Sequence, residues 1–268
     1  RMNKKRIAVC FYGEIRVESI QLFNEEFIKW DSDRYDFDFF IASWENSFIK
    51  DIKFLFTKSK YINFDNLKNF KYPIGNSQQH GANPRSSKSS YLINQVVRIK
   101  EDYEFENGFS YDLVVLLRPD FKIDFRGHTD IQHGIQVGGL LTALDNTILA
   151  NEINPNRPIV SLTHPITMDT ERGAFKLNND HTFIENQQGA NLHANLYNLL
   201  FLQNIDKKTS YNLGPGNIAD EYNPGFSGHM IQGFNFTYHN YIQIVNVFEE
   251  ILMRNHPNHT WDGGINEK

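Results

Sequence analysis

A cation and a carboxylate follow a continuous apolar run near the middle of this sequence. Five apolar residues in a row form Leu113–Leu117, and Arg118, Pro119 and Asp120 come directly after them. Such a run is typical of a strand buried on both faces of an α/β sheet, and Pro119 cannot extend a ladder of hydrogen bonds. Because ligands of open α/β sheets bind at the carboxyl ends of the strands, this pair suits a phosphate, a metal ion or a polar sugar.

Asp120 can act in two ways at this position. A carboxylate after a buried strand can offer oxygen ligands to a divalent cation such as Mn²⁺ or Mg²⁺, and Asp124 lies nearby in the sequence. Arg118 cannot bind a metal, but its guanidinium can neutralise a diphosphate, which would reduce or remove the need for a cation. The alternative is a structural ion pair that closes the strand end. We favour the functional interpretation because of the location.

A second candidate follows the first apolar run, residues 7–12, which ends at Gly13. A glycine lets the backbone approach a ligand closely, Tyr12 could stack on a base, and Arg16 could pair with a phosphate. The glycines of a phosphate-binding loop or of a dinucleotide fingerprint are absent. The alternative is an ordinary turn between a strand and a helix, with a surface arginine.

Two further groups lie in the second half. Asp180 precedes a predicted helix and could act as a general base for an acceptor hydroxyl or bind a sugar, or it could cap the helix. Glu221 could serve as such a base, and His229 or His239 could complete a metal site beside it. Single histidines are more often structural, and neither the Cys/His spacing of a zinc site nor the G-x-S-x-G segment of a serine hydrolase is present.

Strands and helices alternate in the first half, which predicts a mostly parallel sheet with flanking helices. A helix with an inner stripe of Leu92, Val96, Ile99 and Tyr103 should begin after Ser86 or Ser87, either of which could cap it. Strands are expected at residues 7–12, 36–42, 61–64, 111–117, 135–141, 158–163 and 235–241. Further helices are expected around residues 20–30, 48–55, 188–203 and 244–252, and loops at 71–88, 145–157 and 214–228.

The composition excludes several classes of function. A net charge of −5 over 268 residues offers no basic surface for nucleic acid. No apolar run approaches the roughly 18–20 residues that span a membrane, and residues 7–12 are too short for a signal peptide. Cys10 is the only cysteine, so no disulfide can form within the chain, and we expect a reducing compartment, the cytoplasm. We expect one domain over residues 1–268, with a donor-binding half at about 1–125 and an acceptor half at about 126–268.

Together these motifs resemble the small glycosyltransferases of bacteria, phages and large algal viruses with a GT-A-like fold. The resemblance rests on the order of three segments: FYGEIR after the first strand, FFIASW with Trp44 at the end of the second, and YDLVVLLRPDF. In the last segment, Arg-Pro-Asp takes the place of an Asp-x-Asp motif. The resemblance covers the first half well and the second half loosely, and it implies a GT-A-like α/β fold with a less regular C-terminal half.

The resemblance implies a hexosyl- or deoxyhexosyltransferase that moves a sugar from a nucleotide-diphospho-sugar donor to a hydroxyl of a saccharide acceptor. Arg118 stands where many such enzymes have their first metal-binding carboxylate, so a strict need for Mn²⁺ or Mg²⁺ stays open. Asp180 and Glu221 are the catalytic candidates, and Asp120 and His229 are the candidate metal ligands. The donor-binding candidates are Phe11, Tyr12, Gly13, Arg16, Trp44, Lys88, Arg98, Arg118 and Asp120.

Two other interpretations stay open. The chain could be a non-catalytic glycan-binding or structural protein on a transferase-like fold. It could also be another nucleotide-using α/β enzyme, such as a nucleotidyl- or sulfotransferase, although the missing phosphate-loop glycines argue against this. The transferase interpretation requires Arg118 and Asp120 to lie beside the turn at Gly13. Burial of both groups in the interior, or a position remote from that turn, would exclude it.

Overall fold

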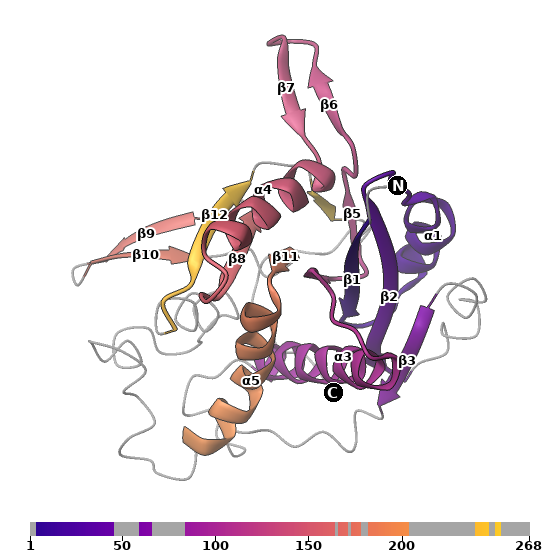
Figure 1. The fold of residues 1–268 in the computed structure, drawn as a ribbon, viewed down its shortest axis with the longest axis vertical. Coiled ribbons are helices and arrows are strands. Elements are labelled where there is room, and N and C mark those ends of the chain that lie inside the picture. Colours follow the sequence, from indigo (N-terminus) through magenta and orange to yellow (C-terminus); the bar gives the residue numbers. More distant parts are fainter. Residues whose placement is uncertain are drawn as a thin grey trace, which may run out of the picture.

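The computed structural model describes residues 4–45, 59–65, 84–163, 166–170, 173–177, 182–203, 239–246 and 250–252. Within these residues a seven-stranded sheet has the order β12-β8-β11-β4-β1-β2-β3 (Figure 1). Its strands are β1 (Lys5–Tyr12), β2 (Tyr35–Trp44), β3 (Ser59–Asp65), β4 (Leu113–Leu117), β8 (Ile159–Thr163), β11 (Thr182–Glu185) and β12 (Ile242–Asn246). Neighbouring strands pair in parallel except at β11, which is antiparallel to β4 and β8. The predicted class, α/β with a mostly parallel sheet, is confirmed.

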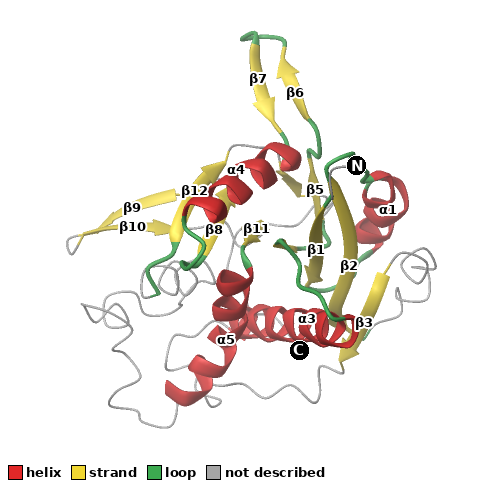
Figure 2. Cartoon of the chain, in the orientation of Figure 1, coloured by secondary structure: helices red, strands yellow, loops and turns green. Residues whose placement is uncertain are grey.

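Helices flank the sheet, and short two-stranded units lie around it (Figure 2). The helices are α1 (Val17–Glu25), α3 (Pro84–Asn107), α4 (Leu140–Ile153) and α5 (Gln187–Gln203), with a 3₁₀ turn, η1 (Phe27–Lys29). None of the helices in the described ranges is long and apolar enough to cross a membrane. The two-stranded units are β5 (Phe121–Ile123) with β13 (Glu250–Leu252), β6 (Gly127–Asp130) with β7 (Ile135–Gly138), and β9 (Ile166–Thr170) with β10 (Gly173–Leu177).

The central strands send alternate side chains into two apolar cores, one on each face of the sheet. In β1, Val9 and Phe11 pack with residues of α1 and α4, whereas Ala8 and Cys10 pack with residues of α3 and α5. Burial raises the pKa of the Cys10 thiol to about 12, so this residue behaves as a small apolar core residue. Two buried faces explain why the central strands are continuous apolar runs in the sequence.

A buried ion pair within α3 is hydrogen-bonded to the first residue of α5. The Lys100 side chain is fully buried, and its Nζ donates to Glu104 Oε2 at 2.8 Å and to Gln187 Oε1 at 2.5 Å. Glu104 Oε1 in turn accepts from the backbone N–H of Tyr111 at 2.7 Å. Because each buried charge has hydrogen-bond partners, the network ties the two helices to the segment that leads into β4.

Most of the predictions of local structure that are wrong concern the second half. The predicted strand at 135–141 ends at Gly138, and α4 begins at Leu140 and replaces most of the predicted loop at 145–157. Residues 244–252 are predicted as a helix, but the described ones, 244–246 and 250–252, belong to the strands β12 and β13. In the predicted strand at 235–241, the described residues 239–241 precede β12. Pairing with β8 and β5 supplies partners that local spacing does not reveal.

One prediction of a helix start is also wrong. Helix α3 begins at Pro84, so Ser86 and Ser87 lie inside it and do not cap it. Proline suits the first helical position because its missing N–H would have no partner there. The predicted helix at 48–55 and the predicted loop at 214–228 lie outside the described residues.

Candidate functional site

The order of the strands places a topological switch point between β1 and β4. From β1 the sheet continues through β2 and β3 on one side, whereas β4 pairs with the other side of β1. Phe11 pairs with Leu117 in this parallel pair, so the residues that follow each strand leave the sheet side by side. Ligands of open α/β sheets bind outside the carboxyl ends of the strands at such a point.

Gly13 is the residue at which the turn after β1 meets the turn after β4. Its φ is +130°, and a Cβ placed on it would lie 3.3 Å from Cδ of Pro119. The end of β2 holds the same turn, because the Gly13 N–H donates to the Ala42 carbonyl at 3.3 Å and the Ile15 N–H donates to Ser43 Oγ at 3.2 Å. The turn therefore lies directly against the Arg-Pro-Asp segment, as the sequence predicts.

We expect Gly13→Ala to lower the free energy of unfolding by about 1–3 kcal/mol, because the added side chain would force strain at this backbone conformation. The new methyl would also press on Pro119. Urea unfolding followed by circular dichroism would measure the change. Gly134→Asn is a matched control, because Gly134 has φ +64° with no atom within 4 Å of an added Cβ, and asparagine tolerates that region. Equal unfolding midpoints for Gly13→Ala and the parent would contradict the prediction.

The segment from Arg118 to Phe121 is a β-turn that pairs its own charged side chains. The Phe121 N–H donates to the Arg118 carbonyl at 3.4 Å, and proline is favoured at the second position of such a turn. Arg118 Nε and Nη2 donate to the two carboxylate oxygens of Asp120 at 3.1 and 2.9 Å. Its Cζ also lies 5.1 Å from the centre of the Phe121 ring. Residues of the same turn therefore hold the guanidinium from two directions.

The two members of this ion pair differ in exposure. The Asp120 side chain is 4% exposed, whereas the Arg118 side chain is 20% exposed. The carboxylate is thus the inner group and the guanidinium the outer one. The pair closes the end of β4, and its cation is the member closer to solvent.

In the described residues, the Asp120 carboxylate is already paired with a positive charge. Mg²⁺ commonly binds one or two carboxylates together with substrate phosphates, but both Asp120 oxygens accept hydrogen bonds from Arg118, whose charge would repel a metal ion placed there. Asp124 is engaged elsewhere: it accepts from the Gly127 N–H at 2.8 Å and lies 2.7 Å from His128 Nδ1. Across the described ranges, no three His, Cys, Asp or Glu side chains gather as they would around a metal ion. The donor set in this part of the chain therefore does not fit the predicted metal site.

Phe11 and Tyr12 do not present their rings to a ligand, which corrects the prediction that they face a nucleotide. Phe11 is fully buried and packs against Phe23 and Phe27, with ring centres 4.7 and 4.9 Å away. Tyr12 is 1% exposed and lies in the core on the opposite face. Because β1 is covered on both faces, its backbone reaches the edge of the sheet while its side chains stay inside.

Trp44 lies at the end of β2 within a stack of rings. It is 8% exposed, and its ring is nearly parallel to that of Tyr91, with centres 5.6 Å apart. Tyr91 in turn meets Tyr197 of α5 edge to face at 5.1 Å, and burial raises the pKa of Tyr197 to about 12. The sequence predicts Trp44 as a donor-binding residue but does not predict its ring partners, because no local spacing links it to rings on two distant helices.

Arg16, the other predicted arginine of this edge, is also paired with a carboxylate. Its Nη2 donates to Glu14 Oε2 at 3.0 Å, and the Arg16 side chain is 31% exposed. Its backbone N–H donates to Ser19 Oγ at 3.1 Å, which fixes the first turn of α1. The structure thus places Arg16 directly after the Gly13 turn, at the start of the helix that follows β1.

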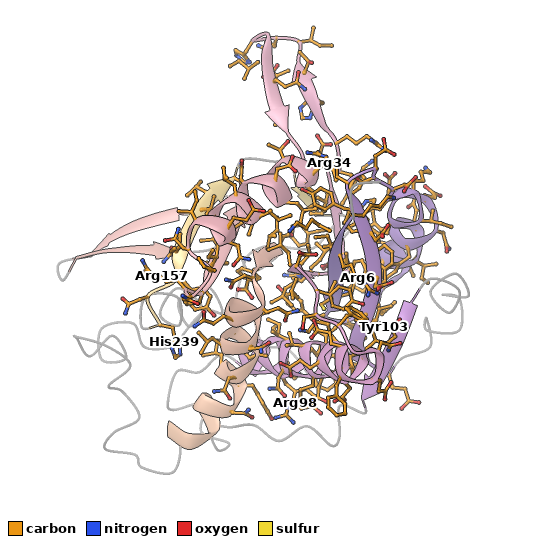
Figure 3. All side chains as sticks on the ribbon, in the orientation of Figure 1. Arg6, Arg34, Arg98, Tyr103, Arg157 and His239 are labelled. Atoms are coloured by element: carbon orange, nitrogen blue, oxygen red, sulfur yellow. The ribbon has the colours of Figure 1, made fainter. Side chains whose placement is uncertain are left out.

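Lys88 and Arg98 both belong to α3 but lie at different positions along its axis. Tyr91 packs at the carboxyl end of β2 and Tyr103 packs on Phe40 in the middle of that strand, so α3 runs from the carboxyl edge toward the amino edge. Lys88 is half-buried near the first of these contacts, whereas Arg98 is exposed on the helix surface (Figure 3). A helix rises about 1.5 Å per residue, so the structure carries Arg98 away from the switch point and corrects its assignment to the donor site.

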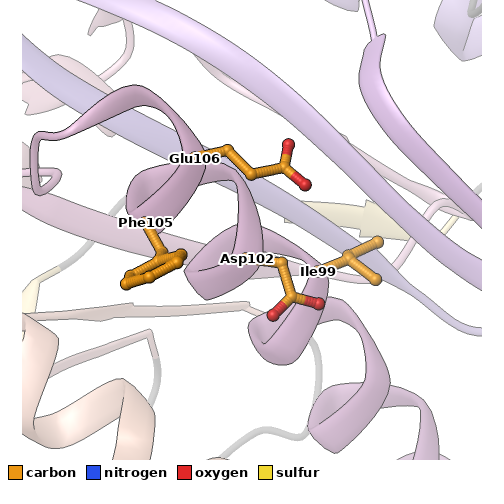
Figure 4. Close-up of a pocket in the computed structure, with 4 residues that line it drawn as sticks. All are labelled: Ile99, Asp102, Phe105 and Glu106. Carbon is orange, nitrogen blue, oxygen red and sulfur yellow. The ribbon is translucent and has the colours of Figure 1, made fainter.

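A hollow on the surface of α3 is not part of the candidate site. It is lined by Ile99, Asp102, Phe105 and Glu106 (Figure 4). These residues lie in the C-terminal half of α3, which leads toward the amino end of β4. The hollow is therefore at the opposite end of the strands from the Gly13 turn.

Comparison with known proteins gives a weak structural likeness. Neither a family model nor a curated protein matches the sequence. Among solved structures, the apo form of mouse xyloside xylosyltransferase 1 is similar with a TM-score of 0.45 and 12% identity, over 90% of this chain and 85% of that chain. A likeness at this score and identity carries no argument about the activity of this chain.

Proposed function

We propose that this chain is a glycosyltransferase that moves a sugar, of the hexosyl or deoxyhexosyl class, from a nucleotide-diphosphate donor to a hydroxyl of a saccharide acceptor. The close approach of the Gly13 turn to Pro119 at the switch point carries this proposal. It brings a glycine turn and an arginine–carboxylate pair together at the edge where α/β sheets bind ligands. The resemblance of the same three segments to small glycosyltransferases supports the same kind of donor.

Arg118 and Arg16 are the proposed partners of the donor diphosphate. Departure of a nucleoside diphosphate develops negative charge, which a preplaced cation stabilises. Arg118 is the outer member of its ion pair, and Arg16 is partly exposed beside the Gly13 turn. The Gly13 backbone can approach the donor closely. Trp44, at the end of the next strand, and Lys88, near the start of α3, complete the proposed donor side.

Asp180 is the proposed general base for the acceptor hydroxyl, with Glu221 as the second candidate. Both residues lie outside the described ranges, as does His229. Thr182 pairs with Leu117, so β11 begins at the edge where β4 ends. Asp180 stands two residues before β11 in the sequence. We assign no step to a divalent cation, because the described donor set at Asp120 does not fit one.

We expect nucleoside diphosphates to raise the melting temperature of this chain, because a ligand that binds the native state stabilises it. We also expect transfer or slow hydrolysis of at least one sugar from a panel of nucleotide sugars. Asp180→Asn should lower turnover by about 100-fold or more, as loss of a general base does. Asp102→Asn is a matched control, because Asp102 is an exposed carboxylate in the C-terminal half of α3.

Three results would contradict the proposal in different ways. Binding of glycans with no turnover of any donor would favour a glycan-binding protein. Transfer of a nucleotidyl or sulfuryl group would favour one of the other nucleotide-using enzymes. Unchanged turnover in Asp180→Asn would reject the assigned base while leaving the donor site in place.

A further inference from the structure

We infer that Asp120 is a positioning residue for Arg118, and that this pair binds the donor diphosphate without a divalent cation. The inference rests on the proposed function, because it concerns the same donor site. It differs from the sequence-based expectation, in which Asp120 itself offers oxygen ligands to Mn²⁺ or Mg²⁺.

The geometry of the turn supports a positioning role. Two parallel hydrogen bonds, at 3.1 and 2.9 Å, fix the plane of the Arg118 guanidinium against the Asp120 carboxylate. The Phe121 ring, 5.1 Å from Cζ, supports the same group. The rigid turn at Pro119, against which Gly13 packs, holds all three residues. A guanidinium oriented in advance loses less conformational freedom when it binds a phosphate.

The position of Asp120 behind the more exposed Arg118 disfavours a metal ion at Asp120. The carboxylate is 4% exposed and lies behind a guanidinium that is 20% exposed. Arg118 already donates to both Asp120 oxygens, so a cation bound to Asp120 would lie close to a positive guanidinium that repels it. A diphosphate that binds the outer face of Arg118 meets an attractive charge and leaves the ion pair intact. The charges at this turn therefore favour a diphosphate held by arginine.

A second, more exposed arginine–aspartate pair at the other end of the sheet provides a control. Arg34 Nη1 donates to both carboxylate oxygens of Asp145, at 2.7 and 2.6 Å. Arg34 directly precedes β2, so this pair lies at the amino edge of the strands, away from the switch point (Figure 3). Breaking it tests the effect of losing such a pair without touching the proposed donor site.

Titration calorimetry of the full chain with inorganic pyrophosphate and a panel of nucleoside diphosphates tests the inference. Each ligand is titrated in excess EDTA and again in Mg²⁺, with the heat of Mg²⁺ binding to the ligand subtracted. We expect the dissociation constant of the best ligand to be the same in both buffers. This comparison needs no variant, so it stands even if a substitution at the turn prevents folding.

The variants then separate positioning from a merely structural role. Arg118→Ala should weaken binding by about 10- to 100-fold, the range for charge-assisted hydrogen bonds. Arg118→Lys should not restore it, because lysine lacks the planar fork. Asp120→Ala should weaken binding by about tenfold, and Asp120→Glu should recover part of the loss. The double variant Arg118→Ala, Asp120→Ala should match Arg118→Ala alone, and Arg34→Ala should match the parent.

The outcomes distinguish this inference from the proposed function. Binding in Mg²⁺ but not in EDTA would overturn the inference and leave a metal-dependent transferase. Tighter binding in Asp120→Ala, or additive losses in the double variant, would also overturn it, because Asp120 would then compete with the ligand or act independently. Absence of binding in both buffers would overturn both proposals.

Discussion

Phe11→Ala should lower the free energy of unfolding by about 3–5 kcal/mol, the cost of removing a large aromatic side chain from a core. Phe11 is fully buried, and its ring lies within 6.2 Å, centre to centre, of Phe23, Phe27 and Phe39. These rings come from β1, β2, α1 and η1, so a cavity here would loosen the contacts among all four elements. A loss of this size is a large part of the roughly 5–15 kcal/mol that stabilises a typical domain.

Chemical unfolding of matched phenylalanine variants would measure this effect. Phe105→Ala is the control, because Phe105 is 90% exposed on α3 and should change the unfolding free energy by less than about 0.5 kcal/mol. Phe11→Leu should lie between the two, because leucine fills part of the cavity. If Phe11→Ala weakened donor binding but left stability unchanged, the placement of Phe11 in the core would be wrong.

The same burial explains which parts of the fold the sequence could predict. The strands β1 and β4 lie at the centre of the sheet with both faces covered, so each appears as a continuous apolar run. Helix α4 was harder to predict because it carries Asp145, Asn146 and Asn151, which favour loops in isolation. In the fold these polar residues bind Arg34, Asn246 and Asn186, respectively. Partners that distant in the sequence leave no local signal.

The candidate site, too, could be predicted from the sequence only in part. The meeting of Gly13 with Pro119 was predictable, because the carboxyl ends of parallel strands share one edge of the sheet. The sequence motif also named Phe11 as a ligand contact, but strand alternation within a doubly covered sheet places its ring in the core. The ring stack of Trp44 with Tyr91 depends on how α3 crosses the sheet, and neither periodicity nor motif spacing encodes that crossing.

Lys100→Met should destabilise the chain by about 3–5 kcal/mol, because it leaves the Glu104 carboxylate largely buried without its counter-ion. Lys100 is fully buried, and its Nζ lies 2.8 Å from Glu104 and 2.5 Å from Gln187. Methionine nearly fills the space of the lysine stem, so the loss reports on the charge more than on packing. Lys122→Met is the control, because its contact with Glu26 spans 3.5 Å between exposed groups and such pairs contribute about 0–1 kcal/mol.

A double-mutant cycle separates the ion pair from the rest of the network. Glu104→Gln keeps an oxygen that can accept the 2.7 Å hydrogen bond from the Tyr111 N–H while it removes the negative charge. The double variant Lys100→Met, Glu104→Gln should therefore lose less stability than the sum of the two single losses, since no unpaired charge stays buried. Urea unfolding of the four proteins would measure the coupling. Additive losses would show that Lys100 and Glu104 act independently, and would contradict the predicted coupling of this pair within α3.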